Sequence, residues 1–188
     1  SIIDELPPGR QPVDTLLVNE SHRARLNGFI RKQVEYGRQV FVVCPKVEYE
    51  DEASSGLRSA EAHTVYLQSV FPDLQIACIH GRMKAKQKDE IMARVLSGEI
   101  NILVSTTVIE VGVDVPNANL MIIENAERFG LSQLHQLRGR IGRGQHKSWC
   151  ILVSDAANDV SRERLKIMTR LSDGFAVSEE DLRLRGPG

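Results

Sequence analysis

The sequence predicts an α/β protein, a three-layer α/β/α sandwich with helices on both faces of a mostly parallel sheet. Short runs rich in valine, isoleucine and leucine alternate with longer amphipathic stretches along the whole chain. Several of the short runs are apolar on both faces, which is typical of strands in a buried parallel sheet. Parallel neighbours need crossover connections, and crossover helices cover both sides of such a sheet.

The predicted elements follow from this alternation. The strands are predicted at 14–18, 39–44, 75–79, 101–105, 120–123 and 148–153. The helices are predicted at 22–36, 57–71, 84–96, 132–137 and 162–171.

The helix predicted at 84–96 shows how a face is assigned. Its apolar side chains form one stripe, which we expect to face the core. The members of the stripe are Ile91, Met92, Val95 and Leu96. Gly98 follows directly and is expected to end the helix, because glycine readily adopts the left-handed conformation found there.

The chain is long enough for one domain, and two segments are expected to lie outside it. With 188 residues, a hydrophobic fraction of 41% and a charged fraction of 26%, it has the composition of a soluble globular domain. We expect the domain to span 13–171. Residues 1–12, which contain Pro7-Pro8-Gly9, are interpreted as an extended lead-in from an upstream region, and 172–188 as the start of a further region that is cut short. Pro45–Gly56 is expected to be a polar excursion between a strand and its helix.

Composition excludes several classes of protein. No apolar run is long enough to span a bilayer, and the first residues do not form a signal peptide. The three cysteines have no CxxC spacing and border apolar runs, so we expect reduced, buried thiols and a cytoplasmic protein without a metal site. The histidines His22, His63 and His146 show no metal-ligand spacing and are expected at the surface.

Charge is distributed unevenly along a chain whose net charge is −1. From Glu99 to Glu127 there is no lysine or arginine, whereas from Arg128 to Ser154 there is no acidic residue. A second basic cluster, 82–88, follows His80-Gly81. Local basic surface on a neutral domain indicates a defined anion site.

Three candidate loops are expected to follow predicted strands, where ligands of open α/β sheets gather, and the third of them lies within 131–144. In the first, Gly81 would let the backbone approach a phosphate closely, and His80 and Arg82 would add polar or charged groups. The alternative is a plain turn in which Gly81 satisfies a positive φ. In the second loop, Thr106 offers a hydroxyl and Asp114 a carboxylate on a tight turn that follows Gly112. The alternative is that Thr106 caps a helix and Asp114 only shapes the turn.

The segment 131–144 is the strongest candidate. At about 100° per residue, its leucines and Ile141 gather on one side, while Gln136, Arg140 and Arg143 gather on the opposite side. Guanidinium groups are permanently charged planar donors that suit phosphate. Gly139 and Gly142 are expected either to be tolerated in the helix or to end it early and leave Arg143 on a loop. The other interpretations are an Arg-Gly-rich nucleic-acid patch and a solvated face.

One motif is missing from the sequence. No GxxxxGK[ST] run occurs, so the chain contains no P-loop that would cradle a nucleotide.

Taken together, the loops resemble the second RecA-like lobe of superfamily 2 helicases. Thr106 through Pro116 resembles motif V, Gln136 through Arg143 resembles motif VI, and Val40 through Pro45 is similar to motif IV. The stretch from Glu127 to Arg140 is similar to both the RecG and the transcription-repair coupling factor families, and Val108 through Ala118 favours RecG. The segment before the domain, from Ile2 to Arg10, also favours RecG.

The resemblance to the RecG family implies a motor lobe that acts on branched double-stranded DNA. It implies that ATP and Mg²⁺ are held mainly by a first RecA-like lobe of the same polypeptide. Arg143 and Arg140 would then act as arginine fingers and Gln136 would orient nearby groups. Gly112 and Asp114 would contact the nucleotide or couple its state to the DNA side, while His80, Gly81, Arg82 and Thr106 would hold DNA backbone.

The same resemblance implies that the chain supplies catalytic residues yet hydrolyses no ATP alone, and we expect it to be monomeric. Residues 1–12 would be an interdomain linker, and 172–188 the start of the family's translocation motif. In one respect the chain departs from many superfamily 2 lobes, because Ala85 and Lys88 stand where those lobes carry Gln and Arg. We therefore do not infer the contact that the arginine makes with the DNA backbone in those lobes. The alternatives are the corresponding lobe of a coupling factor, a self-contained nucleotide-binding enzyme, and a passive nucleic-acid-binding module.

Overall fold

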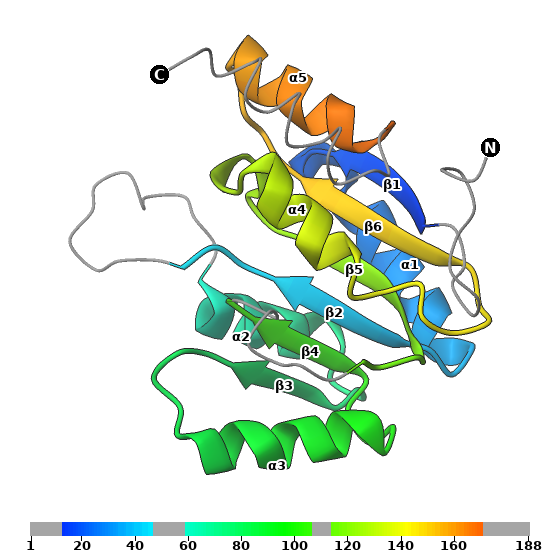
Figure 1. Cartoon of the computed structure of the whole chain (residues 1–188). Helices are drawn as coiled ribbons and strands as arrows, with labels where there is room; N and C mark the ends of the chain where they lie inside the picture. The colour runs from blue at the N-terminus through cyan, green and yellow to red at the C-terminus, as the bar shows by residue number, and fades with distance from the viewer. Residues whose placement is uncertain (1–12, 47–58, 107–113, 171–188) are drawn as a thin grey trace, which may run out of the picture.

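A computed structural model describes residues 13–46, 59–106 and 114–170 (Figure 1). The predicted linker 1–12, the segment 172–188 and most of the excursion Pro45–Gly56 lie outside these ranges, as does Gly112.

A single parallel sheet forms the centre of the domain. Its strands are β1 Val13–Val18, β2 Gln39–Val43, β3 Ile76–Ile79, β4 Ile102–Ser105, β5 Ala118–Ile123 and β6 Ser148–Val153. They are arranged in the order β1-β6-β5-β2-β4-β3, and every pairing among them is parallel. The predicted strands are confirmed, with shifts of one or two residues at their ends.

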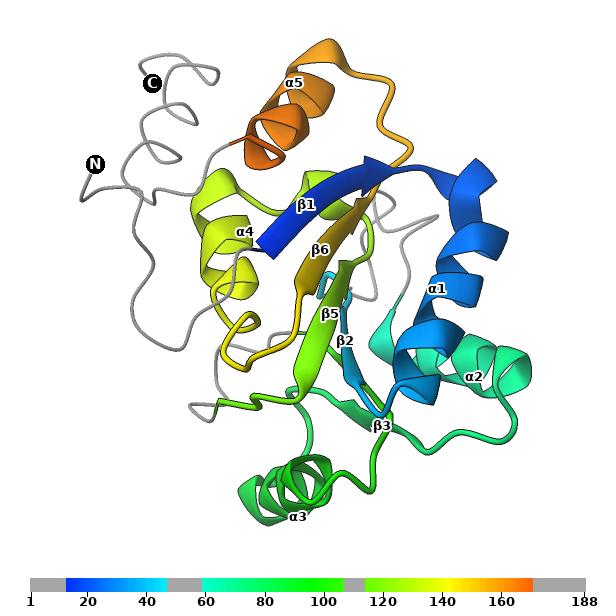
Figure 2. The same cartoon turned by 90° about the vertical axis from the view of Figure 1, so that its right-hand side faces the viewer.

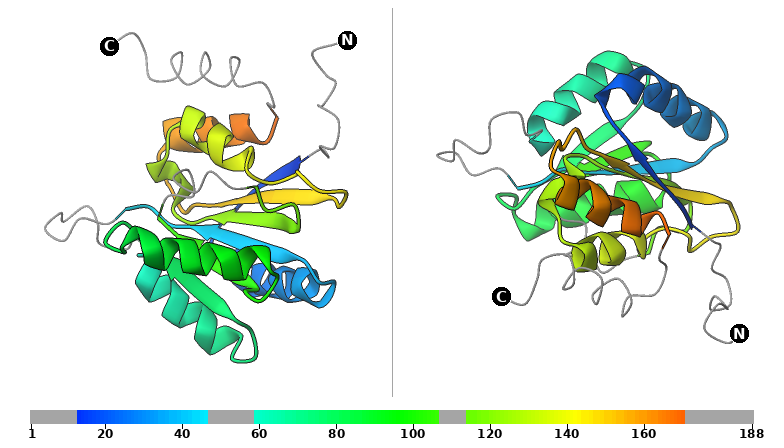
Figure 3. Two further views of the ribbon diagram at one scale, coloured as in Figure 1. Left: turned by 60° about the horizontal axis from the view of Figure 1, so that its bottom comes forward. Right: turned by 90° about the horizontal axis from the view of Figure 1, so that it is seen from above.

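Helices cover both faces of this sheet, so the predicted α/β/α sandwich is confirmed. The helices are α1 Arg23–Glu35, α2 Ala60–Val70, α3 Ala85–Leu96, α4 Leu131–Arg138 and α5 Asp159–Met168, with short 3₁₀ turns η2 Glu20–His22 and η4 Ala126–Arg128. α1 and α2 lie on one face and α3, α4 and α5 on the other (Figures 2 and 3). No helix in the described ranges is long and apolar enough to cross a bilayer.

Two apolar cores explain why the strands are hydrophobic on both sides. Successive residues of a strand point to opposite faces. In β2, Val40 and Val42 therefore pack against the α1 and α2 side, whereas Phe41 and Val43 pack against the α3, α4 and α5 side. All six residues of β5 are buried, because this strand lies inside the sheet with helices above and below.

The end of α3 follows from a single glycine. Gly98 has a φ of +86°, its N–H donates to the carbonyl of Val95 (3.0 Å), and the N–H of Glu99 donates to that of Arg94 (3.0 Å). These are the two hydrogen bonds of a Schellman motif, which satisfies carbonyls that the helix leaves without partners. The expected helix stop is confirmed. The predicted stripe was wrong for Leu96, which is 49% exposed, because the face of α3 that packs on the core is narrower: Met92 and Val95 are buried, and Ile91 is partly buried.

Two glycines offer a matched test of this interpretation. Gly98→Ala should lower the free energy of unfolding by about 1 kcal/mol, because a Cβ at positive φ is strained. Gly28→Ala, in the exposed interior of α1 with no atom within 4 Å of the new Cβ, should raise it by roughly 0.5–1 kcal/mol. Urea unfolding measures both. Equal effects of the same sign would contradict the assignment.

Candidate functional site

The segment 131–144 is a short helix followed by a loop. In α4, Leu131, Leu134 and Leu137 are at most 2% exposed and anchor the helix on the sheet. After Arg138 the hydrogen bonds shorten to the i→i−3 type, since the N–H of Arg140 donates to the carbonyl of Leu137 (2.9 Å). The apolar side of the predicted register is confirmed, and so is the alternative in which the helix ends early.

The two candidate arginines therefore do not share a helix face with Gln136, and that part of the prediction was wrong. Ile141 is fully buried and fixes the loop to the core, and Gly142 turns the chain at a φ of +79°. Arg140 and Arg143 project from this loop and are partly exposed, while Gln136 is exposed on α4. The helical spacing of the leucines ends with α4, directly before Gly139.

The loop brings Arg143 next to Asp114. Nε and Nη2 of Arg143 donate to the carbonyl oxygen of Gly139 (3.1 and 3.0 Å), and Nη1 lies 3.6 Å from Oδ2 of Asp114. The two side chains are 34% and 51% exposed. An exposed pair of this kind contributes little to stability. The pair matters for position, because it brings the predicted arginine finger, Arg143, next to Asp114, which is predicted to contact the nucleotide.

Backbone contact keeps the two loops together. A Cβ added to Gly144 would lie 2.3 Å from the carbonyl oxygen of Pro116. Only glycine permits this approach. Asp114 and Arg143 are thus held near each other by the packing of the segments that carry them, and not only by their charges.

Arg138 has a structural role that the sequence did not reveal. It belongs to the basic stretch that begins at Arg128, yet it is 7% exposed. Its Nη1 donates to Oγ1 of Thr15 in β1 (3.1 Å) and to the carbonyl of Met168 at the end of α5 (2.8 Å). Burial lowers the pKa of Arg138. It connects three elements inside the domain and is not part of a surface anion site.

The second candidate set lies at the ends of two neighbouring strands. Ile79 of β3 pairs with Ser105 of β4, so His80 and Thr106 emerge side by side. The N–H of Arg82 donates to Nδ1 of His80 (3.3 Å). Gly81 lies in a turn that the N–H of Met83 closes by donating to the carbonyl of His80 (3.1 Å), but its φ is not positive, so the predicted reason for a glycine there was wrong. No atom lies within 4 Å of a Cβ built at Gly81. The backbone at Gly81 is open to close approach from outside.

The two sets lie at opposite edges of the sheet. The arrowheads of β2, β3 and β4 point toward the carboxyl edge, at the left of Figure 1. This edge carries the residues that follow strands, which are His80, Gly81, Arg82 and Thr106. Asp114 precedes β5, and Arg140 and Arg143 precede β6, so they lie near the amino edge. The expectation that all the candidate loops follow strands was therefore wrong for these three residues, because the segment 139–147 descends from α4 to the start of β6.

A buried ionic network fixes the carboxyl edge. Glu124, directly after β5, is 1% exposed and accepts two hydrogen bonds of 2.7 Å from the guanidinium of Arg23 in α1. Its Oε2 also lies 3.4 Å from Nε2 of His63 in α2. Burial alone would raise the pKa of Glu124, but the hydrogen bonds from Arg23 and His63 outweigh it and lower the pKa to about 2. The expectation that His63 lies at the surface was wrong, since it is 2% exposed and satisfied by this carboxylate.

The predicted burial of the cysteines is confirmed for two of the three. Cys44 and Cys150 are buried, and Cys78 is half-buried. Burial raises the pKa of the Cys150 thiol to about 12, which makes it a poor nucleophile. In the described ranges, no three His, Cys, Asp or Glu side chains gather in a way that would hold a metal ion.

Comparison with known proteins relates this arrangement to helicases. The family described as Helicase conserved C-terminal domain matches residues 21–145. The chain is 50% identical over 188 residues to the ATP-dependent DNA helicase RecG of Synechocystis sp., covering all of this chain and 22% of that protein. It is 52% identical over 189 residues to RecG of Acidithiobacillus ferridurans, covering 27% of that protein. The chain thus spans about a quarter of the length of these relatives.

Solved structures show the same fold. The structure of RecG bound to a three-way DNA junction superposes with a TM-score of 0.80 at 44% identity, over 98% of this chain and 24% of that one. The yeast DEAD-box splicing factor Prp28 superposes over 93% of this chain and 37% of that one, with a TM-score of 0.64 at 17% identity, a likeness of fold alone. The predicted resemblance to the second RecA-like lobe of the RecG family is confirmed.

The contact between the two loops can be tested at Gly144. Gly144→Ala should lower the free energy of unfolding by about 1–3 kcal/mol, because the Cβ must displace the Pro116 backbone. Gly139→Ala is the control, since its Cβ would be 3.4 Å from the nearest atom, an ordinary contact. Thermal or urea unfolding measures the difference, and a Gly144→Ala protein as stable as the control would contradict the described approach.

The network at Glu124 makes stability depend on acid pH. The pKa of Glu124 falls on folding from 4.5 to about 2, so its contribution is fully present above pH 4.5 and is lost as pH falls toward 2. That contribution is on the order of 3 kcal/mol. Glu124→Gln should cost about 3 kcal/mol at neutral pH, because Arg23 then keeps only the more exposed carboxylate of Glu20 as a charged partner. The deficit should shrink between pH 4.5 and pH 3.

An exposed ion pair provides the control. Asp73 pairs with Arg31 through its carboxylate, and its side chain is 60% exposed. Asp73→Asn should lower the free energy of unfolding far less than Glu124→Gln does, because solvent screens an exposed pair. Urea unfolding of the three proteins across this pH range gives the comparison. A Glu124→Gln deficit that stays constant with pH would show that the carboxylate is not the titrating group.

Proposed function

Because the chain belongs to the helicase conserved C-terminal domain family and matches RecG proteins along its whole length, we propose that it is the second motor lobe of an ATP-dependent helicase that acts on branched double-stranded DNA. The single observation that carries this proposal is the position of Arg143. Its guanidinium is oriented by the carbonyl of Gly139, lies near Asp114 and remains one-third exposed.

That position suits an arginine finger. Nε and Nη2 are used to orient the side chain, and no hydrogen bond from Nη1 of Arg143 is found among the described residues. A permanently charged planar donor of this kind stabilises charge that develops on a transferring phosphoryl group. Arg140 supplies a second guanidinium from the same loop. Gln136, exposed on the preceding helix, orients groups around the nucleotide.

Asp114 and Gly112 connect nucleotide state to the rest of the lobe. The carboxylate of Asp114 competes with nucleotide phosphate for the guanidinium of Arg143, so a phosphate in the cleft changes which partner Arg143 holds. The close packing of Gly144 on Pro116 transmits that change between the two loops. Thr106 follows β4 at one edge of the sheet, and Asp114 precedes β5 near the other edge.

The carboxyl edge contacts DNA backbone in this proposal. His80, Gly81, Arg82 and Thr106 come from adjacent strand ends and offer a cation, hydrogen-bonding side chains and open backbone. Such groups hold sugar and phosphate without reading bases, which a motor that moves along any sequence requires.

The complete active site needs a second lobe. ATP and Mg²⁺ would be held mainly by a first RecA-like lobe of the same polypeptide, joined through residues 1–12, and closure of the two lobes would step the protein along the duplex. Residues 172–188 would begin the translocation motif. Full-length activity would include fork regression and migration of Holliday junctions in the cytoplasm. The coupling-factor alternative is less favoured, because the relatives compared above are RecG proteins.

Replacing Arg143 tests the finger. In the full-length protein, Arg143→Ala should reduce the DNA-stimulated ATPase rate by roughly 10³-fold or more. Arg143→Lys should restore little, because an ammonium lacks the planar fork. Arg162→Ala, which removes an exposed arginine paired with Asp159, is the control and should leave the rate unchanged. Near-normal turnover of Arg143→Ala with DNA binding intact would refute the assignment.

The chain alone should be inactive. Since it contains no P-loop, the 188-residue chain should show no ATP hydrolysis and only weak, salt-dependent DNA binding, with a dissociation constant of roughly 10⁻⁴ M at physiological salt. Measured hydrolysis would favour a self-contained enzyme. Tight binding that needs no second lobe would favour a passive nucleic-acid-binding module.

A further inference from the structure

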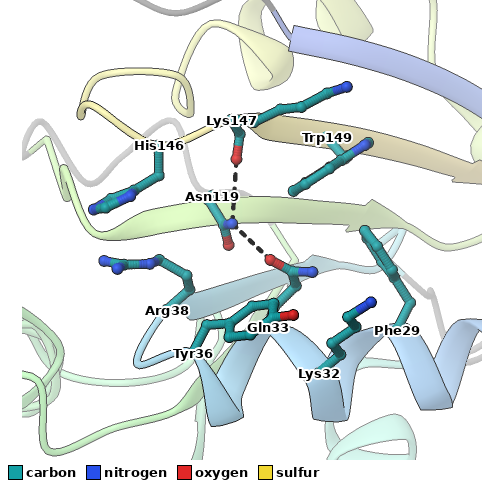
Figure 4. Close-up of a pocket in the computed structure, with 9 residues that line it drawn as sticks. All are labelled: Phe29, Lys32, Gln33, Tyr36, Arg38, Asn119, His146, Lys147 and Trp149. Carbon is teal, nitrogen blue, oxygen red and sulfur yellow. Dashed lines mark hydrogen bonds between the residues drawn. The ribbon is translucent and has the colours of Figure 1, made fainter.

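A groove on the α1 side of the sheet is not used by the proposed motor mechanism. It is formed by the second half of α1 from Phe29 to Tyr36, by Arg38, by Asn119 in β5, and by 146–149 at the start of β6 (Figure 4). Its volume is about 440 Å³. We refer to it as the α1–β6 groove.

Cationic side chains surround the groove. Lys32, Arg38 and Lys147 line it together with the imidazole of His146, and no aspartate or glutamate is among the lining residues. Arg38 donates to the neutral amide of Asn117 (2.7 Å), and no salt bridge joins Lys32 or Arg38 to a carboxylate among the described residues. Lys147 alone has an acidic partner, Asp14 at 3.0 Å. The groove therefore favours an anionic ligand.

Aromatic side chains lie among these cations. Tyr36 is 61% exposed, and the ammonium of Lys32 lies 6.0 Å from its ring centroid. Trp149 is held by an edge-on contact with Phe29, at a ring separation of 5.0 Å, and the ammonium of Lys147 lies 5.5 Å from its centroid. Aromatic rings interleaved with cations suit a ligand that is both planar and anionic.

The floor of the groove carries a buried amide with an unused acceptor. Asn119 is 4% exposed. Its Nδ2 donates to Oε1 of Gln33 (2.9 Å) and to the carbonyl of Lys147 (3.2 Å), while Oδ1 has no hydrogen-bond partner. In Figure 4, Asn119 and Gln33 lie between the cationic end at Arg38 and His146 and the aromatic end at Phe29 and Trp149. Oδ1 is itself buried, so a ligand in the groove would not contact it directly, and the amide of Asn119 instead holds Gln33 and the backbone of Lys147 in place.

We propose that the α1–β6 groove binds a nucleotide unit of single-stranded DNA. The cations hold the phosphodiester and Tyr36 stacks on the base. A nucleotide carries both features that the groove complements, an anionic phosphate and a planar base, whereas an acidic peptide lacks the planar base. The choice of DNA over RNA rests on the proposed function.

This site is distinct from the DNA-backbone set at the carboxyl edge. Asn119 lies near the start of β5, and 146–149 spans the start of β6, so the groove opens near the amino edge. It also lies on the α1 face, whereas Leu134 and the rest of α4 pack on the opposite face. A strand that is separated from the duplex would therefore meet this lobe at a second place.

The groove contains its own probe, because Trp149 is the only tryptophan of the chain. Titration of the 188-residue chain with a short oligothymidylate at low salt should change Trp149 fluorescence, and added salt should reverse the change. Polyglutamate of the same charge should leave the fluorescence unchanged. A peptide response equal to that of DNA, or no response to DNA, would overturn the proposal.

Variants separate stacking from charge. Tyr36→Ala should weaken the association roughly 5- to 150-fold, the range for loss of a stacking platform, and Tyr36→Phe should retain it. Lys147→Ala should reduce the dependence of log K on log salt by about 0.7, the value for one phosphate contact on a single strand. Lys166→Ala is the matched control, an exposed lysine paired with Glu163 on α5, and should leave that dependence unchanged.

The outcomes remain distinct from those of the motor proposal. Arg143→Ala should abolish ATPase activity in the full-length protein and leave the Trp149 response unchanged, so either proposal can fail alone. Because Tyr36 is exposed, Tyr36→Ala should keep the unfolding midpoint of the parent chain. If a folded Tyr36→Ala chain binds the oligonucleotide as tightly as the parent, the groove does not bind a base.

Discussion

Parallel strand pairing is the constraint from which the placement of every functional residue follows. When all neighbours run in the same direction, each strand must be followed by a connection that returns to the opposite edge of the sheet. A residue that follows a strand lies at one edge, and a residue that precedes a strand lies at the other. His80 and Thr106 are thereby placed beside each other, and Arg143 is placed at the opposite edge with Asp114.

Buried polar groups fix these edges at a stability cost that the surrounding contacts offset. Glu124 ties α1 and α2 to the end of β5 through Arg23 and His63. Arg138 ties α4 to β1 and to the end of α5. An unpaired charge in either place would be costly, so the partners specify how the helices sit on the sheet. The loop that carries the proposed fingers, Arg140 and Arg143, begins directly after Arg138.

The errors of prediction share a physical origin. Helical periodicity assigns Leu96 and Arg143 to a helix face, but it does not show how wide the packed face is or where the helix ends. Leu96, at the end of α3, is 49% exposed although Val95 beside it is buried. Arg143 follows Gly142, whose φ of +79° ends any helical register. His63 and Arg138 looked like surface residues because their buried partners, Glu124 and Thr15, are distant in sequence.

The sequence by itself determined the elements, their order and the family, because period, glycine positions and motif residues are local properties of the chain. Only the tertiary structure decided which residues meet. The approach of Gly144 to Pro116, the pairing of Arg143 with Asp114, and the groove around Asn119 each join segments that are separated along the chain. Such contacts depend on strand order, and strand order results from packing of the whole sheet and not from any single segment.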